Sequence, residues 1–203
     1  MIQFDRAKLK AVILYTCEKC QPSRLGAVKL HKVLYFSDML RYAGEGSAIT
    51  GATYRKRKLG PTCDQLLPTL RELETDGALE IRDADYFGYK KKEFIAKAAP
   101  DLERLNAAEL ALLDEVIEFV CENNSAKTIS DYSHNAAWDM TDFGAVISYP
   151  SVFHLFPNQV STEALDWSVA EVTKIEDLKS QGRALGNASY RAFRSRVLEK
   201  EHG

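Results

Sequence analysis

The sequence predicts a mostly α-helical α+β protein, in which a helical domain carries a small winged-helix-like β element. Apolar residues recur at helical spacing near the beginning of the chain and again after residue 106. Between these segments, two short runs with β-branched and aromatic residues flank Gly88, which is the pattern of a β-hairpin. Helices on both sides of one hairpin define the expected fold class.

The composition is that of a folded globular protein. The chain has 203 residues, of which 45% are hydrophobic and 28% are charged, and it shows no internal repeat. We therefore expect one domain over residues 1–182, with residues 183–203 as a basic helical extension of the same domain. The net charge of -2 provides no overall attraction to nucleic acid or to acidic membranes.

Two features predict a cytoplasmic location and no membrane partner. No apolar run approaches the ~20 residues that a transmembrane helix needs, and the polar segment 1–10 lacks the apolar core of a signal peptide. The four cysteines are also too few and too unevenly spaced to staple a chain of this length, which suits a reducing compartment.

The first two elements are expected to be helices. Residues 7–20 have helical apolar spacing, and the helix ends near Pro22. Ser23 can cap a second helix over residues 24–43, in which apolar side chains cover well over half of the helical wheel. Such a helix has to be surrounded by other elements, so we expect it at the centre of the fold.

The next segment is expected to form a short strand and a helix. Residues 52–59 mix β-branched, aromatic and basic side chains, and the Gly-Pro pair at 60–61 ends the strand. Thr62 and Gln65 form a capping box for a helix that extends to residue 76. Pro68 lacks a backbone donor, so either the helix is kinked there or its regular part begins near residue 67.

The hairpin completes the β element. Residues 79–85 and 92–97 are expected to be its strands, with Gly88 in the turn. Together with the preceding helix and the strand at 52–59, this hairpin resembles a winged helix.

The remainder is expected to be helical. Asn106 and Glu109 cap one helix, and residues 128–138 form another. A loop then leads to Ser161, which can cap a helix that runs to residue 181.

The cysteine and histidine pattern does not indicate a metal site. Cys17 and Cys20 form a CxxC pair, but a zinc site needs two further ligands, and no other cysteine or histidine has matching spacing. We therefore interpret this pair as two ordinary helical thiols.

The residues that resemble catalytic groups have the wrong spacing. Asp131, Ser133 and His134 lie too close together on one expected helix to converge as a triad. His134 and Trp138 lie at i and i+4, which favours an aromatic stack. No glycine-rich phosphate loop is present. We expect no catalytic, metal-binding or cofactor-binding residue, and therefore not an enzyme.

Two basic runs, at residues 55–58 and 90–92, leave open an alternative function. If their strands pair, alternate side chains share one face and form a positive patch, as in a winged-helix DNA-binding transcriptional regulator. Lysines on edge strands also prevent aggregation, and we favour that interpretation over binding of nucleic acid.

Four separated motifs carry a family resemblance: KLHKVLYFSD at residues 29–38, TGATY at 50–54, KLGP at 58–61 and SHNAAW at 133–138. Their order and spacing resemble the Panacea domain, the SocA-like antitoxin family that includes phage-associated GepA-type proteins, over about residues 17–156. The resemblance implies an antitoxin that neutralises a co-encoded protein toxin by direct binding. For SocA-like members it also implies delivery of the toxin to a ClpXP-type protease as a proteolytic adaptor. The family has no assigned catalytic residues.

Candidate partner-binding residues come from these motifs and from the basic C-terminal segment. In that segment, apolar positions form a stripe flanked by arginines, which is typical of an interface helix or of a helix packed on its own domain. The motif residues have a similar alternative as core or turn positions. The candidates are Lys29, Lys32, Tyr35, Asp38, Tyr54, Lys58, His134, Trp138, Tyr190, Phe193 and Arg194.

Overall fold

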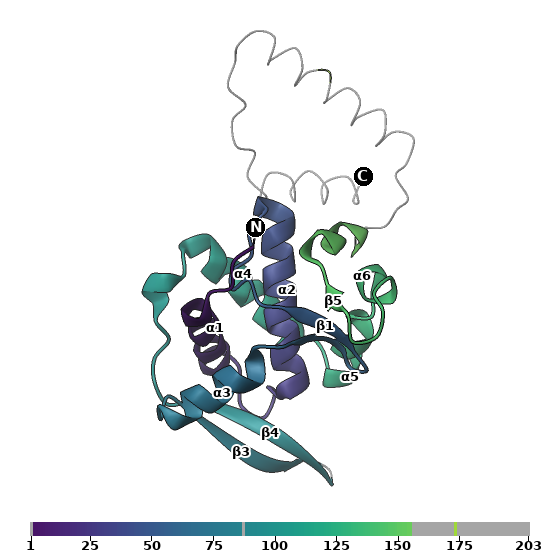
Figure 1. The fold of residues 1–203 in the computed structure, drawn as a ribbon. Coiled ribbons are helices and arrows are strands. Elements are labelled where there is room, and N and C mark those ends of the chain that lie inside the picture. The colour runs from purple at the N-terminus through teal and green to yellow at the C-terminus, as the bar shows by residue number, and fades with distance from the viewer. Residues whose placement is uncertain (1, 87, 156–172, 174–203) are drawn as a thin grey trace, which may run out of the picture. The chain divides into compact units, whose positions relative to one another are not determined.

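Helix α2 (Ala27–Glu45) is the central element of the fold in a computed structural model that describes residues 2–86, 88–155 and 173 (Figure 1). Almost every residue from 29 to 39 is buried, so this part of the helix is covered on all sides. Its neighbours are α1 (Arg6–Lys19), α4 (Ala107–Ile117), α5 (Ala126–Tyr132), strand β2 (Gly60–Cys63) and a 3₁₀ helix at Tyr149–Leu155. The expected central helix is confirmed.

The ends of the first two helices have ordinary caps. The Asp5 side chain accepts a hydrogen bond from the Lys8 amide at the start of α1. Helix α2 begins after Gly26 without a side-chain cap, so the expected cap at Ser23 is wrong. It ends at Gly46, which has φ +69°, a conformation that glycine adopts without strain.

The strands form two separate antiparallel sheets. Strand β1 (Tyr54–Arg57) lies between β2 and the two-residue strand β5 (Val146–Ile147). Strands β3 (Leu79–Tyr86) and β4 (Tyr89–Ala96) form the expected hairpin with Gly88 in its turn. Because β1 belongs to the other sheet, the winged-helix arrangement is not confirmed.

Strand β2 corrects the prediction that residues 60–61 end the strand region. Gly60 pairs with Arg57, and Pro61 pairs with Lys56. A proline is tolerated because β2 is an edge strand of this sheet. Strand β5 was expected to be loop, since a two-residue strand has too little pattern to be recognised.

Helix α3 (Leu66–Thr75) begins near residue 67, as the second of the two predicted alternatives has it, and contains Pro68 in its first turn, where a missing donor costs little. The capping box predicted from Thr62 and Gln65 is wrong, because α3 has no side-chain cap. The Gln65 side chain instead accepts a hydrogen bond from the Thr53 amide.

The later helices agree in part with prediction. Helix α4 has the predicted capping box between Asn106 and Glu109, and it continues as a π-helical turn at Glu118–Glu122. The single helix expected over residues 128–138 is two helices, α5 and α6 (Ala136–Asp139). The break occurs because the Asn135 side chain caps α6 by accepting from the Trp138 amide.

Residues up to 155 form one compact unit with the mostly helical α+β composition that the sequence predicts. A short 3₁₀ turn at Leu102–Arg104 precedes α4. None of the helices within the described residues is long and apolar enough to cross a membrane. The helix expected to begin at Ser161, the boundary between residues 182 and 183, and the basic C-terminal helix all lie outside the described residues.

Candidate functional site

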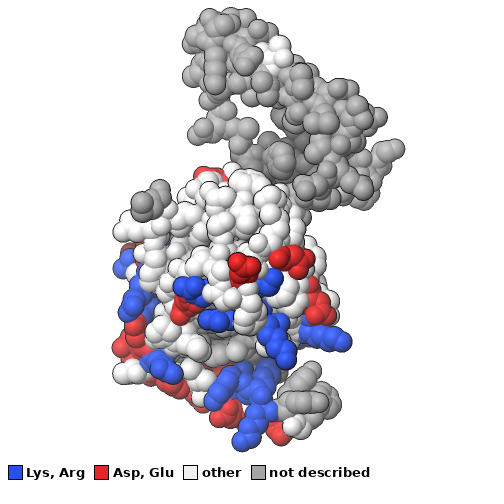
Figure 2. Space-filling model, turned by 45° about the vertical axis from the view of Figure 1, so that its right-hand side comes forward, with Lys and Arg blue, Asp and Glu red and all other residues white. Residues whose placement is uncertain are grey.

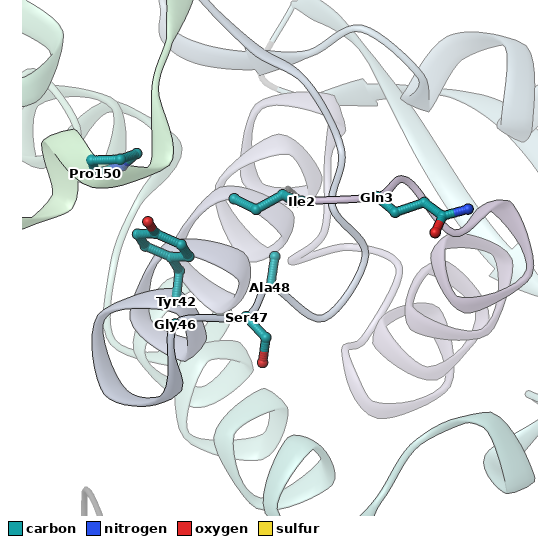
Figure 3. Close-up of a pocket in the computed structure, with 7 residues that line it drawn as sticks. All are labelled: Ile2, Gln3, Tyr42, Gly46, Ser47, Ala48 and Pro150. Atoms are coloured by element: carbon teal, nitrogen blue, oxygen red, sulfur yellow. The ribbon is translucent and has the colours of Figure 1, made fainter.

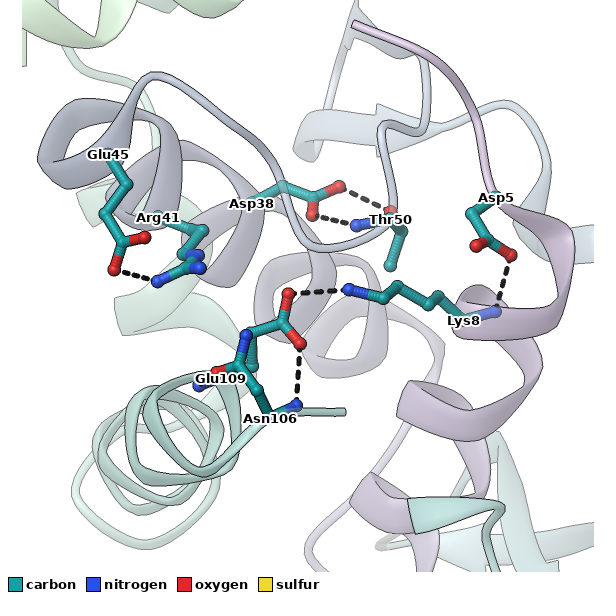
Figure 4. A network of polar contacts seen from close by, with 8 residues as sticks. All are labelled: Asp5, Lys8, Asp38, Arg41, Glu45, Thr50, Asn106 and Glu109. Atoms are coloured by element: carbon teal, nitrogen blue, oxygen red, sulfur yellow. Dashed lines mark hydrogen bonds and ion pairs between the residues drawn. The ribbon is translucent and has the colours of Figure 1, made fainter. Parts of the chain in front are cut away.

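Asp38 joins two of the sequence motifs, those at residues 29–38 and 50–54, in the interior. Its carboxylate accepts hydrogen bonds from the Thr50 amide at 2.7 Å, the Thr50 hydroxyl at 2.5 Å and the Tyr54 hydroxyl at 2.8 Å. The Tyr149 hydroxyl lies 3.1 Å from the same carboxylate. Figure 4 shows the contact between Asp38 and Thr50, which ties helix α2 to the loop before β1.

No cation lies within ion-pair distance of Asp38 among the described residues, and its side chain is fully buried. Burial raises the pKa of this carboxyl, while the hydrogen bonds from Thr50, Tyr54 and Tyr149 oppose that shift. A buried carboxyl with this many donors is a structural anchor, because a lost donor would leave it unsatisfied.

A second set of motif contacts covers the outer edge of β2. The His31 ring accepts a hydrogen bond from the Cys63 amide through Nδ1 at 3.1 Å, and the Lys32 ammonium donates to the Pro61 carbonyl at 2.9 Å. Both side chains come from one turn of α2. Burial lowers the pKa of His31 to about 4, so the ring is neutral and free to accept. Two backbone groups of the edge strand β2, the Cys63 amide and the Pro61 carbonyl, thereby have hydrogen-bond partners within the chain.

Lys32, Gly60 and Ser133 meet at one point. Gly60 has φ +90°, and a Cβ atom there would lie 2.3 Å from Ser133 Oγ and 2.5 Å from Lys32 Nζ. Lys32 is 1% exposed and Ser133 is fully buried. Burial lowers the pKa of Lys32 to about 7. Only glycine fits between these groups without displacing them, so close packing explains the glycine of the KLGP motif.

Helices α5 and α6 hold the turn between β1 and β2. The Ser130 hydroxyl donates to the Leu59 carbonyl at 3.1 Å, and the Trp138 indole donates to the Arg57 carbonyl at 3.3 Å. The Lys56 ammonium lies 3.9 Å from the centre of the Trp138 ring. Trp138, in the sequence motif at residues 133–138, therefore helps to hold the β1–β2 turn in place.

The predicted stack of His134 on Trp138 is confirmed. The ring centres are 4.1 Å apart and the planes differ by 22°, although the two residues are not on one helix as predicted. Burial lowers the pKa of His134, and the positive charge of Lys32 adds to this effect. A neutral imidazole suits a stacking role.

The structure separates the predicted candidates into interior and surface residues. Lys29, Lys32, Tyr35, Asp38 and Tyr54 are all buried, and the Lys29 ammonium donates to the Cys121 carbonyl at 2.9 Å. These five side chains contribute to the interior of the fold, and their contact with a partner stays a prediction.

Lys58 is exposed, and His134 and Trp138 are half-buried, so contact of these three with a partner stays a prediction. Tyr190, Phe193 and Arg194 lie outside the described residues.

Several exposed apolar residues near the same turn were missed by sequence reasoning. Leu59 in the turn is 56% exposed, and Met140, Phe143 and Val146 of the α6–β5 segment are 69%, 68% and 48% exposed. A signal was present for Leu59, because leucine between Lys58 and Gly60 is an unusual turn residue. The other three gave none, because isolated apolar residues on surfaces are normal.

The side of the molecule with α5, α6 and the β1–β2 turn is turned forward in Figure 2. Within the described part of the chain, lysine and arginine side chains are concentrated over the lower region of this view, where acidic side chains are interspersed, and the region above it is largely uncharged. The face thus offers positive charge beside neutral surface.

The cysteines have structural positions. Cys17, Cys20, Cys63 and Cys121 are free and buried, and burial raises the pKa of Cys17 to about 12. No cluster of three or more histidine, cysteine or acidic side chains that could hold a metal occurs within residues 2–86 and 88–155.

A pocket of about 450 Å³ lies at the C-terminal end of α2 (Figure 3). It is lined by Ile2, Gln3, Tyr42, Gly46, Ser47, Ala48 and Pro150. None of these side chains is charged or metal-ligating, so the lining itself does not indicate a substrate.

Comparison with known proteins gives one match. The chain matches the family described as antitoxin SocA-like, Panacea domain, over residues 30–139. This span is just over half of the chain and includes all four motifs except Lys29, the first residue of the first motif, although it is shorter than the expected 17–156. No curated protein and no solved structure matches the chain significantly. The protein therefore belongs to the SocA-like antitoxin family with a Panacea domain.

Proposed function

We propose that this protein is an antitoxin that neutralises a toxin encoded beside it by binding the toxin directly, without catalysing a reaction. The observation that carries the proposal is the family match over residues 30–139. The same residues build the β1–β2 turn and the buried contacts that hold it. The part of the chain that matches the family thus holds an exposed turn in place, which supports a role in binding.

The composition of the exposed face also supports a protein partner. Leu59, Met140 and Phe143 are each more than half exposed, and they lie close in the fold to basic residues of β1. Exposed apolar side chains next to arginine and tryptophan are typical of protein interfaces. A soluble partner in the cytoplasm is the setting that we propose for this contact.

The nearest resemblance to a catalytic pair is better explained by structure. Lys32 with a lowered pKa beside Ser133 has the residue types of a serine nucleophile and its base. Both side chains are buried, the Ser133 hydroxyl donates to the Ser130 carbonyl, and the Lys32 ammonium donates to the Pro61 carbonyl. We therefore include the absence of catalysis in the proposal.

Delivery of the toxin to a ClpXP-type protease is a second, finer part of the proposal. It predicts that the toxin is degraded in the presence of this protein, whereas simple occlusion leaves the toxin intact. The half-life of the toxin in cells with and without the protease separates the two modes. Neutralisation that persists in protease-deficient cells would leave occlusion as the mechanism.

The alternative of a DNA-binding regulator assumed that the strands with the two basic runs pair with each other, and they do not. The two basic runs lie in separate sheets, and several of their side chains are already paired. Arg55 pairs with Asp64 at 2.6 Å, and Lys92 pairs with Asp83 at 2.8 Å. We favour the toxin as partner for this reason.

The test is co-expression with the product of the neighbouring reading frame. We expect that this product alone stops growth, that the full-length chain restores growth, and that the two proteins co-purify at a fixed ratio. A neighbouring product that is harmless, or a toxic one that this chain neither rescues nor binds, would contradict the proposed function.

A further inference from the structure

We propose that the hairpin tip, formed by Arg57, Lys58 and Leu59, is the anchor of the toxin interface, and that it docks into an apolar pocket rimmed by carboxylates on the toxin. This inference rests on the proposed function and specifies the surface and the partner chemistry. All three side chains of the hairpin tip are exposed, and Leu59 is 56% exposed.

Hydrogen bonds from neighbouring helices fix the backbone of the hairpin tip and of β2, the strand that follows it. Three alternate carbonyls, those of residues 57, 59 and 61, accept hydrogen bonds from Trp138, Ser130 and Lys32. The donors come from three different helices, α6, α5 and α2. A turn that is held at each of these carbonyls loses little conformational freedom on binding, which is the main advantage of a preorganised anchor.

Leu59 is at an unusual position for an exposed leucine. Turn positions favour glycine, asparagine, aspartate, serine and proline, since these residues supply turn geometry or hydrogen bonds. The structure uses the Leu59 backbone, through the Ser130 hydroxyl, and does not bury the Leu59 side chain. An apolar side chain that is presented on a rigid turn suits insertion into an apolar pocket.

The charges of the hairpin tip point to carboxylates on the partner. Arg55, at the start of the same basic run, is paired with Asp64, and Lys56 lies on Trp138. Arg57 and Lys58 have no carboxylate within ion-pair distance among the residues that the structure describes. Asp139 and Asp142 belong to the α6–β5 segment beside this turn. Neither carboxylate forms an ion pair with a lysine or arginine among the described residues.

An acidic protein surface fits the hairpin tip better than nucleic acid does. Phosphate contacts need only cations, so they leave the exposed leucine that follows Arg57 and Lys58 without a role. A pocket with an apolar floor and an acidic rim uses both the leucine and the neighbouring cations. Other occupants of the hairpin tip, a second copy of this chain or its own residues 156–203, are outcomes of the test below.

The first measurement compares two pairs of matched variants in the full-length protein. Leu59→Ser is paired with Leu67→Ser. The Leu67 side chain on α3 is 60% exposed, so its replacement should cost the fold as little stability as that of Leu59. Lys58→Glu is paired with Lys90→Glu, an exposed lysine of the other hairpin. The probe is the purified product of the neighbouring reading frame, and binding is measured by calorimetry and by association kinetics at two salt concentrations.

We expect Leu59→Ser to weaken binding by about 30-fold, the loss that is typical of an interface hot spot. We expect Lys58→Glu to slow association by about tenfold and to remove most of its salt dependence. The variants Leu67→Ser and Lys90→Glu should bind as the wild type does. Binding by both hairpin-tip variants within twofold of the wild type overturns the inference and leaves the proposed function intact, whereas no binding by the wild type overturns the proposed function itself.

The second measurement does not depend on the stability of a variant. With p-benzoylphenylalanine in place of Leu59, light should cross-link the chain to a toxin segment that contains apolar residues and carboxylates. A cross-link only to a second copy, or only to residues 156–203, would show a different occupant and would overturn the inference.

Discussion

Replacing Gly60 by alanine tests the convergence of motifs beneath the hairpin tip. The new Cβ would lie 2.3 Å from Ser133 Oγ and 2.5 Å from Lys32 Nζ, at a backbone φ of +90°. Real Cβ contacts are longer, so one or both side chains must move. Both are buried, and their movement breaks the hydrogen bond from Lys32 to the Pro61 carbonyl or that from Ser133 to the Ser130 carbonyl.

The expected loss of stability has two parts. The positive φ costs about 1–2 kcal/mol for a residue with a Cβ. A broken buried hydrogen bond that leaves Lys32 or the carbonyl unsatisfied adds about 1–3 kcal/mol. Gly60→Ala should therefore lower the free energy of unfolding by about 2–5 kcal/mol. Urea denaturation followed by circular dichroism and by tryptophan fluorescence measures this loss.

The matched control is Gly46→Ala. Gly46 also has a positive φ, +69°, but a Cβ there meets no atom within 4 Å. This variant should show only the conformational cost of about 1–2 kcal/mol. Equal losses for Gly46→Ala and Gly60→Ala, within about 0.5 kcal/mol, would refute the close packing of Lys32, Gly60 and Ser133.

Three further predictions concern the pH dependence, the core and nucleic acid. Because burial lowers the pKa of Lys32 from 10.5 to about 7, the unfolded chain binds more protons between these pH values. The free energy of unfolding should thus rise with pH across that window by a few kcal/mol, and the difference between wild type and Lys32→Met should show this rise. Leu34→Ala, at a residue that is 1% exposed, should cost about 2–5 kcal/mol in urea melts, whereas exposed Leu67→Ala should cost less than about 0.5 kcal/mol; equal small losses would contradict the central position of α2. In gel-shift assays with upstream DNA at ~150 mM salt we expect no tight complex, and a complex that Arg55→Ala with Arg57→Ala abolishes would restore the regulator alternative.

The helices could be predicted from the sequence because their signals are local. Apolar periodicity in α1 and α2 and the capping box at Asn106 depend only on neighbouring residues. The expected helix over residues 128–138 failed because periodicity continues across Asn135, whose side chain caps a new helix. The local pattern thus predicts which residues are helical better than it predicts where one helix ends.

The sheet was predicted less well because its pairing is not local. Gly60 and Pro61 resemble strand breakers, yet they pair with β1 while His31 and Lys32 from α2 satisfy the free edge. Strand β5 joins β1 from a position about ninety residues later in the sequence. Neither contact leaves a signal in the residues near Gly60.

The candidate site was predicted from the shared motifs and the C-terminal segment, and its contact with a partner stays a prediction. Lys29, Lys32 and Asp38 became candidates because they lie in a shared motif, and a core position was left open for the motif residues. The structure buries all three and gives each a hydrogen-bond partner inside the chain. Lys58 is the one residue of the first three motifs on the candidate list that is exposed within the described part of the chain.

The separation of buried motif residues from exposed surface residues bears on how partner specificity is encoded. Two motif residues, Lys32 and Trp138, hold the backbone of the hairpin tip and of β2, so their replacement should destabilise the protein before it alters partner choice. The side chains of Leu59, Met140 and Phe143 contribute little to stability, since they are more than half exposed. Substitutions at such positions can change the shape and charge of the interface at little cost in stability. On the proposed function, we therefore expect the choice of toxin to depend on these exposed residues and not on the buried motif residues.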